Sequence, residues 1–159
     1  MLIDVTSFTS GPRQIENAVE TRTNANQIAV AERINGYIGF LQTDFLKSVV
    51  GNGLCQSVDE YSNTEHEQKD ESMESLIALL KEPFADYVFF HMLRDMNVQP
   101  TITGLVQLKC ANSYVSPLEK GVQTWNRMVD NLERFVSEVD VEGVTIEKNM
   151  LTRINQFNL

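Results

Sequence analysis

Residues 84–96 read FADYVFFHMLRDM, and this stretch decides the fold class. Wound as a helix, it carries apolar side chains on nearly all sides: Tyr87, Val88, Phe89, Phe90, Met92 and Leu93. A helix of this kind is buried on every side rather than along one stripe. We therefore expect residues 84–96 to lie at the centre of a helical core.

A second helix is predicted immediately before this stretch. Asp70 or Ser72 can cap it, and its apolar residues are Met73, Leu76, Ile77 and Leu80. Pro83 lacks the backbone N–H that a helix interior uses, although it is acceptable in a first turn. The sequence therefore predicts a kink or a restart at Pro83.

The clearest amphipathic helix runs from Asn24 to Val50. Apolar residues recur there every three or four positions: Ile28, Ala31, Ile34, Ile38, Leu41, Phe45 and Val49. Gly51 and Gly53 are expected to end this helix, because glycine is favoured just past a helix end. Residues 54–61 then predict a short further helix. At the start of the chain, residues 1–22 predict an extended arm that leads into a short helix.

Beyond the central helix the pattern changes to strand formers over residues 98–116, which predicts a β-hairpin or a long extended loop. Ser116 and Pro117 then form a good start for an amphipathic helix that reaches Val139. Residues 142–159 predict an extended tail. The sequence thus predicts one mainly α domain over residues 1–159: a small bundle of about four to five helices, with an inserted hairpin or loop and extended termini.

Composition excludes several functional classes. The 159 residues are 42% hydrophobic and 22% charged, which is typical of a globular chain. We expect no membrane span, since no run of about 18 apolar residues exists, and the start lacks secretory features, which predicts synthesis in the cytoplasm. The formal net charge of −9 argues against binding nucleic acid by affinity.

The sequence predicts a protein without catalytic, cofactor-binding or metal-binding residues. Cys55 and Cys110 lie far apart, and we expect them to be reduced and mostly buried. His66 stands between two glutamates in the acidic segment 59–74, where a metal site could be drawn, but neighbouring residues rarely converge on one ion. His91 is better explained as a core histidine than as a general base.

Charged and aromatic residues on the predicted helices also have structural explanations. Asp86, Arg94 and Asp95 share the apolar helix, so their charges must be paired or face outward. An ion pair within the helix or between subunits is the preferred interpretation. Trp125 lies on an apolar stripe, which favours core packing over a role as an interface anchor.

Three segments are predicted to be too extended to bury their own apolar side chains: residues 1–22, 98–116 and 142–159. Such segments usually pack on neighbouring molecules. If identical copies exchange them head to tail, the contact closes into a ring or grows as a helix. The candidate assembly contacts are Ile102, Leu105, Val106, Leu108, Tyr114, Ile154, Phe157 and Leu159.

Four segments, in order, resemble a family of head-to-tail connector (adaptor) proteins of tailed Bacteroidetes bacteriophages, including crAss-like phages. They are Ile34-Asn-Gly-Tyr-Ile through Asp44-Phe-Leu-Lys-Ser-Val-Val-Gly51, Phe84 to Asp95, Ala111 to Pro117 with Thr124-Trp-Asn-Arg-Met-Val129, and Arg153-Ile-Asn-Gln-Phe-Asn-Leu159. These short segments are spread in order between residues 34 and 159.

The resemblance implies a non-enzymatic structural protein of the virion neck, made in the host bacterial cytoplasm. It implies a ring of twelve copies that docks on the portal protein, contacts tail or further neck proteins, and gives passage to DNA without specific binding. An acidic surface is compatible with such a channel, because it does not hold DNA.

The sequence is also compatible with two other functional classes. A small acidic cytoplasmic phage protein could act as a regulator or inhibitor by occupying a partner's basic site. A hydrolase that uses acidic residues and a divalent metal is a third class, although the sequence shows no paired ligands at helical spacing.

Overall fold

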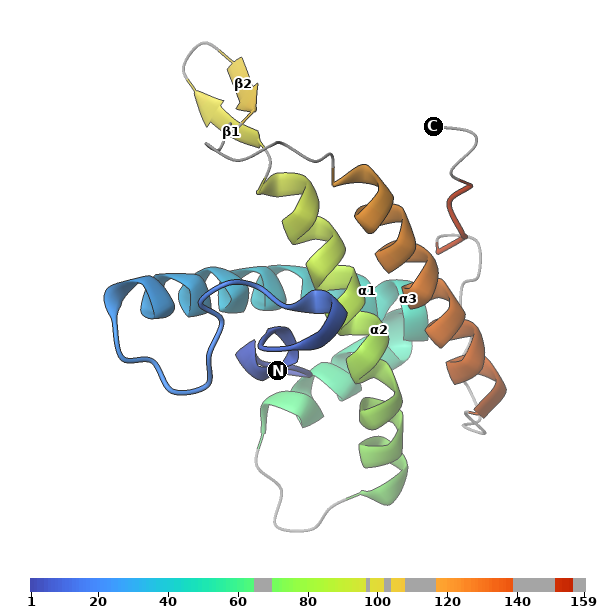
Figure 1. Ribbon diagram of the computed structural model, residues 1–159. Helices are drawn as coiled ribbons and strands as arrows, with labels where there is room; N and C mark the ends of the chain where they lie inside the picture. The colour runs from blue at the N-terminus through green and yellow to red at the C-terminus, as the bar shows by residue number, and fades with distance from the viewer. Residues whose placement is uncertain (65–69, 97, 102–103, 108–116, 139–150, 156–159) are drawn as a thin grey trace.

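The computed structural model describes residues 1–64, 70–96, 98–101, 104–107, 117–138 and 151–155. The described part holds the 3-10 helices η1 (Val5–Phe8) and η2 (Gly11–Arg13), the α-helices α1 (Ala25–Asn63), α2 (Glu71–Asp95) and α3 (Leu118–Glu138), and the strands β1 (Val98–Thr101) and β2 (Gly104–Gln107). The prediction of a mainly helical protein is confirmed (Figure 1).

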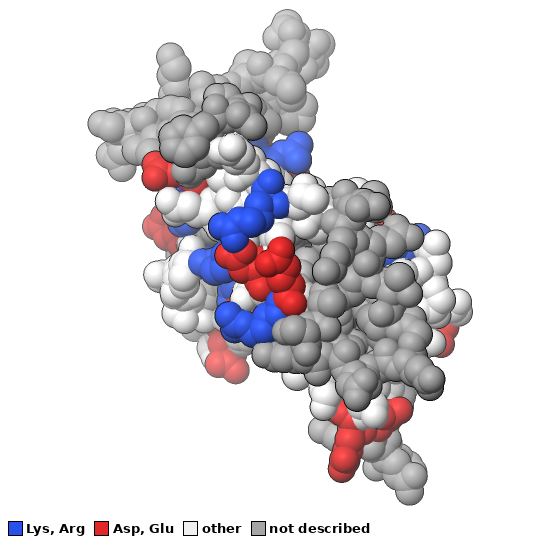
Figure 2. Space-filling view, turned by 90° about the vertical axis from the view of Figure 1, so that its right-hand side faces the viewer, with Lys and Arg blue, Asp and Glu red and all other residues white. Residues whose placement is uncertain are grey.

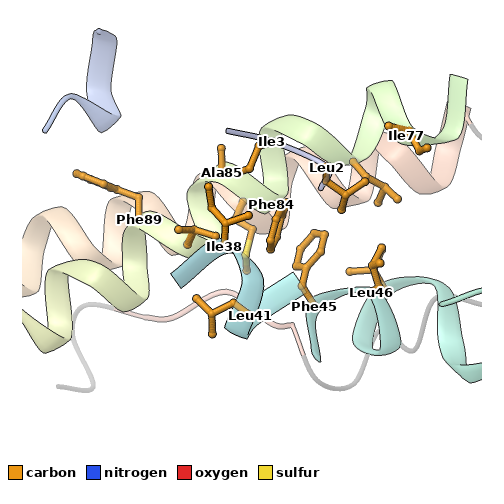
Figure 3. Close-up of a cluster of buried hydrophobic side chains, with 14 of the residues drawn as sticks. Leu2, Ile3, Ile38, Leu41, Phe45, Leu46, Ile77, Phe84, Ala85 and Phe89 are labelled. Atoms are coloured by element: carbon orange, nitrogen blue, oxygen red, sulfur yellow. The ribbon is translucent and has the colours of Figure 1, made fainter. Parts of the chain in front are cut away.

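The centre of the fold is α2, which packs against α1 and against α3. Phe84, Val88, Phe89 and Met92 are buried, which confirms the prediction that this stretch lies in the core. Figure 3 shows Phe84 facing Phe45 of α1, and their ring centroids lie 5.0 Å apart. Residues that point in opposite directions around α2 are buried because both neighbouring helices cover them.

The helix α1 consists of two limbs that meet at Gly51. This residue has φ 74° and ψ 171°, which interrupts the helical geometry, and Figure 1 shows the second limb turning back from the first. The two helices predicted on either side of Gly51 therefore form one bent element. The described residues hold three α-helices in total, fewer than the four or five predicted.

Of the kink or restart predicted at Pro83, the restart is wrong, because α2 continues through this residue. Leu80 and Phe84, on either side of Pro83, are both buried. Packing on the neighbouring helices therefore holds one continuous helix despite the lost backbone hydrogen bond. The predicted cap is confirmed: the Asp70 carboxylate accepts hydrogen bonds from the backbone N–H groups of Ser72 and Met73 at 3.0 and 3.2 Å.

The N-terminal arm differs from its prediction in two ways. Its described residues form η1, η2 and turns rather than a short α-helix. Leu2, Ile3, Val5 and Phe8 are buried in the core of their own chain, so the expectation that the arm needs a neighbouring molecule is wrong for these side chains. Figure 3 shows Leu2 and Ile3 among the side chains of α1 and α2.

A polar bridge fixes the arm to both limbs of α1. The Leu2 N–H donates to the Gln42 side-chain carbonyl at 2.8 Å, and the Gln42 amide donates to Asp59 at 2.5 Å. Gln42 precedes the bend at Gly51 and Asp59 follows it. The bend therefore creates the site that the arm fills, which no local sequence pattern could indicate.

The strands β1 and β2 form an antiparallel pair in which Val98 lies opposite Gln107 and Thr101 opposite Gly104. Figure 1 shows this pair beyond the end of α2. Both strands fall within the segment 98–116, for which a hairpin or loop was expected, but residues 102–103 and 108–116 lie outside the described residues. None of the helices in the described part is long and apolar enough to cross a membrane.

Candidate functional site

The structure describes only some of the predicted assembly residues. Leu105 and Val106 lie in β2, opposite Pro100 and Gln99 of β1. Ile154 lies beside α3, where its backbone is hydrogen-bonded. The other predicted contacts lie outside the described residues: Ile102, Leu108, Tyr114, Phe157 and Leu159.

Ile154 belongs to an extended segment, residues 151–155, that docks on α3. The Asn126 side-chain N–H donates to the Ile154 backbone carbonyl at 3.0 Å, and the Asn126 side-chain carbonyl accepts from the Ile154 backbone N–H at 2.8 Å. The indole N–H of Trp125 donates to the Thr152 carbonyl at 2.8 Å. We call Trp125, Asn126 and Asp130 the tail site; Asp130 forms an ion pair with Arg153.

The amphipathic pattern of α3 explains why this site faces outward. Met128, Val129, Leu132 and Phe135 are buried in the core, whereas Asp130 is exposed and Asn126 is partly exposed. Asn126 and Asp130 are four residues apart, which places both on one face of the helix. An extended segment that runs along this face can therefore contact both side chains.

Trp125 connects the tail site to the core. Its ring packs against Phe90 and Tyr87 of α2, with centroids 4.8 and 6.2 Å away, while its N–H binds the tail. The prediction of core packing is confirmed for the ring. The hydrogen bond to Thr152 is an additional role that the apolar stripe did not indicate.

The tail site recognises main chain more than side chains. An asparagine amide offers both a donor and an acceptor, and here it satisfies the N–H and the C=O of one residue, as a neighbouring β-strand would. The Asp130–Arg153 pair, by contrast, depends on a particular side chain of the tail. The site is therefore suited to hold an extended peptide with an arginine next to the clamped residue.

Ile154 was predicted as an assembly contact and Trp125 as a core residue, whereas no prediction was made for Asn126 and Asp130 as site residues. The sequence feature that relates Asn126 to Asp130 is their spacing of four residues on the polar face of a predicted helix. Many polar pairs with this spacing are only solvated. The partners of Asn126 and Asp130 lie 28 and 23 residues away in sequence. No local pattern specifies that pairing.

A second polar cluster lies where the arm, α2 and α3 meet. Asp86 has no solvent exposure and accepts hydrogen bonds from Arg13 of η2, at 2.9 Å, and from Arg127 of α3. Arg13 also pairs with the exposed Glu82. The predicted ion pair exists, but the expectation that it lies within the helix or between subunits is wrong, because Asp86 joins three segments of one chain.

The cluster has a structural role, because it joins the arm, α2 and α3 through charged side chains. The hydrogen bond to Asp86 raises the pKa of Arg127, which keeps its guanidinium charged. Burying the Asp86 carboxylate without a cation would be costly, and two arginines remove that cost. A shallow pocket of about 460 Å³ lies beside the cluster and is lined by Gly11, Pro12, Glu119, Lys120, Gln123, Thr124 and Arg127.

His91 packs against aromatic rings, consistent with the core histidine expected. Its ring meets Tyr87 edge-on at 4.6 Å, and burial together with nearby Arg94 lowers its pKa below 6.5.

In the part of the chain that the structure describes, no group of His, Cys, Asp and Glu side chains could hold a metal ion. His66 and its glutamate neighbours lie outside that part. Cys55 is free and buried, as predicted, while Cys110 is not among the described residues.

The surface near α3 is mixed in charge. Figure 2 shows the side of the molecule that lies at right in Figure 1, and acidic and basic side chains are interleaved at its centre. The face does not resemble the continuous basic surface that binds a phosphate backbone. The comparisons with known proteins identify no relative: no protein-family model, curated protein or solved structure matches the chain.

Proposed function

We propose that the protein is a ring subunit of the head-to-tail connector of a tailed bacteriophage. The proposal rests on the resemblance to the connector family of four short segments, which are spread in order between residues 34 and 159. A helical core with surface-docked extended segments is compatible with such a subunit. The protein would act without catalysis, cofactor or metal, in the neck of the virion.

In this proposal the partners are further copies of the chain, twelve in the family's ring, the portal protein, and tail or further neck proteins. Residues 98–116 would form the inserted hairpin, and its apolar residues would contact an adjacent subunit. DNA would pass through the ring without specific binding. The net charge of −9 supports this role, since an acidic wall repels the phosphate backbone.

Light scattering over a range of protein concentrations, together with negative-stain imaging, tests the proposal. Rings of about twelve subunits, formed alone or on added portal protein, are the expected result. A chain that stays at its monomer mass of 18.0 kDa and does not bind portal protein would overturn it.

One alternative has its own supporting observation. Residues 59–74 concentrate seven acidic side chains against Lys69 alone, and such a segment could occupy a basic site on another protein. A regulatory or inhibitory role would then produce a tight one-to-one complex rather than a ring. The mass measured in the same experiment separates these two results.

A further inference from the structure

The outward face of the first limb of α1 carries an exposed aromatic ring between two opposite charges. Phe40 is 77% exposed, the largest fraction among the large hydrophobic side chains that the structure describes. Exposed residues three or four positions apart extend from it in both directions along the helix, which places them on one side. We call this row the α1 face; it consists of Glu32, Gly36, Gly39, Phe40, Thr43 and Lys47.

The packing of the described chain does not require the two glycines of the α1 face. Each lies inside a helix, where glycine is less favourable than alanine by about 1 kcal/mol. Neither Gly36 nor Gly39 has a positive φ, and a Cβ atom at either position would meet nothing within 4 Å. A glycine on a helix surface lets a second backbone approach closely, nearer than the usual 8–10 Å between packed helices.

The α1 face is complementary to itself when two copies lie antiparallel. A two-fold axis between residues 39 and 40 places Phe40 of each copy opposite Gly39 of the other, so the largest side chain meets the smallest. The same axis places Glu32 of each copy opposite Lys47 of the other. An isologous contact repeats each pairing, which gives an opposite-charge pair at both ends. A parallel arrangement would instead place like charges together.

We propose that the α1 face is a docking site for a second copy of this chain, with the two α1 helices antiparallel around Phe40. The inference does not rest on the proposed function, because a two-fold pair does not close into a ring by itself. One pair of short helix faces is smaller than the interface of a stable complex, so we expect a dissociation constant of about 0.1 mM. At the low micromolar concentrations of unfolding experiments the copies are therefore separate.

The charges at the two ends of the face allow a test by reversal and rescue. Glu32 and Lys47 are about 22 Å apart along one helix, which is beyond the screening length at physiological salt. Coupling between the two positions therefore reports a contact between copies. Glu32→Lys alone, or Lys47→Glu alone, places like charges at both ends of the pair. The double variant with both substitutions restores two opposite-charge pairs.

Sedimentation equilibrium of the full chain, from about 0.02 to 1 mM protein, measures the dissociation constant. We expect each single reversal to weaken dimerisation by roughly 10-fold, because two pairs are replaced by two repulsions. The double reversal should return the dissociation constant to within roughly 2-fold of wild type.

A bulky residue at Gly39 tests the close approach of the helices. Gly39→Leu would occupy the space of Phe40 of the other copy and should abolish the dimer. Gly53→Leu is the matched control, because this exposed glycine also lies in α1 but outside the face, and a Cβ atom there meets nothing within 4 Å. Both changes add apolar surface and a better helix former, so only the first should affect dimerisation. Circular dichroism verifies the fold of each variant.

A wild-type chain that remains monomeric at 1 mM would overturn the proposal, and so would a double reversal as weak as the single ones. Dimerisation that survives Gly39→Leu would also overturn it. The measured mass separates this result from the proposed function. Rings that form equally well with all these variants would refute the α1 pair and leave the connector proposal standing, whereas rescued dimers without rings or portal binding would do the reverse.

Discussion

Asp86 is the residue at which three separate segments of the chain meet. Its carboxylate has no solvent exposure and is held by Arg13 and Arg127. Asp86→Asn would leave two guanidinium groups facing a neutral side chain. We expect the free energy of unfolding in urea to fall by about 2–4 kcal/mol, near the lower end for a broken buried pair because Arg127 is partly exposed.

Asp95→Asn is the matched control, since it lies on the same helix. Its carboxylate is exposed and accepts a hydrogen bond from the Tyr37 hydroxyl at 3.0 Å. The control should cost less than about 1 kcal/mol. Equal losses for the two variants would show that the buried cluster contributes nothing special to stability.

His91 provides a prediction about pH. Burial and nearby Arg94 lower its pKa in the folded state, while Asp95 acts in the opposite direction more weakly. His91 in the unfolded state therefore binds a proton more readily than His91 in the folded state. The contribution of neutral His91 to stability is present above pH 6.5 and is lost as the pH falls through the lowered pKa. We expect His91→Gln to lose less stability than wild type between about pH 7.5 and 5.5 in urea titrations. Parallel pH profiles for the two proteins would contradict this.

At the scale of the element, the bend of α1 depends on Gly51. Its φ of 74° and ψ of 171° fall in a region that side chains with a Cβ atom disfavour. Gly51→Ala should therefore reduce the free energy of unfolding by about 1–3 kcal/mol. Chemical denaturation measures the change.

Gly53 gives the corresponding control two residues later. Its φ lies outside the left-handed region, and a Cβ atom there would meet nothing within 4 Å. Gly53→Ala should stabilise the protein by up to about 1 kcal/mol, since alanine is the better helix former. A similar effect at both positions would argue against a conformational requirement at Gly51.

The N-terminal arm is the element whose role differs most from its sequence prediction. Phe8 is fully buried within its own chain. Phe8→Ala should cost about 3–5 kcal/mol at any protein concentration, as expected for a large buried side chain. Phe40→Ala is the control, because 77% of Phe40 is exposed, and its effect should stay below about 0.5 kcal/mol. A Phe8→Ala effect that grows with protein concentration would instead place the arm on a neighbour.

At the scale of the whole molecule, the charge imbalance opposes folding. The chain carries 22 acidic and 13 basic side chains, and the resulting repulsion is largest when the chain is compact. Raising the NaCl concentration from about 0.02 to 0.3 M should therefore raise the melting temperature by a few degrees, because salt screens exposed charges. A fall in melting temperature would mean that attractive surface pairs dominate. Differential scanning fluorimetry measures either result.

Features that local chemistry controls could be predicted from the amino-acid sequence. The apolar side chains on nearly all sides of residues 84–96 predict a buried helix, and α2 packs against both α1 and α3. The cap at Asp70 and the interruption at Gly51 follow from side-chain and backbone stereochemistry within a few residues. The helical class of the fold was therefore predictable, and so was the packing of Trp125 against the core.

The pairing of distant segments could not be predicted, because it depends on tertiary packing. Asp86 meets arginines 73 and 41 residues away, and Asn126 clamps a backbone 28 residues away. Packing also overrode a local rule at Pro83, where buried neighbours keep one helix intact. The Asp86 contacts form because the arm and α3 both pack against α2. Hydrophobic spacing encodes which face of a helix is buried, but not which polar group lies opposite its exposed face.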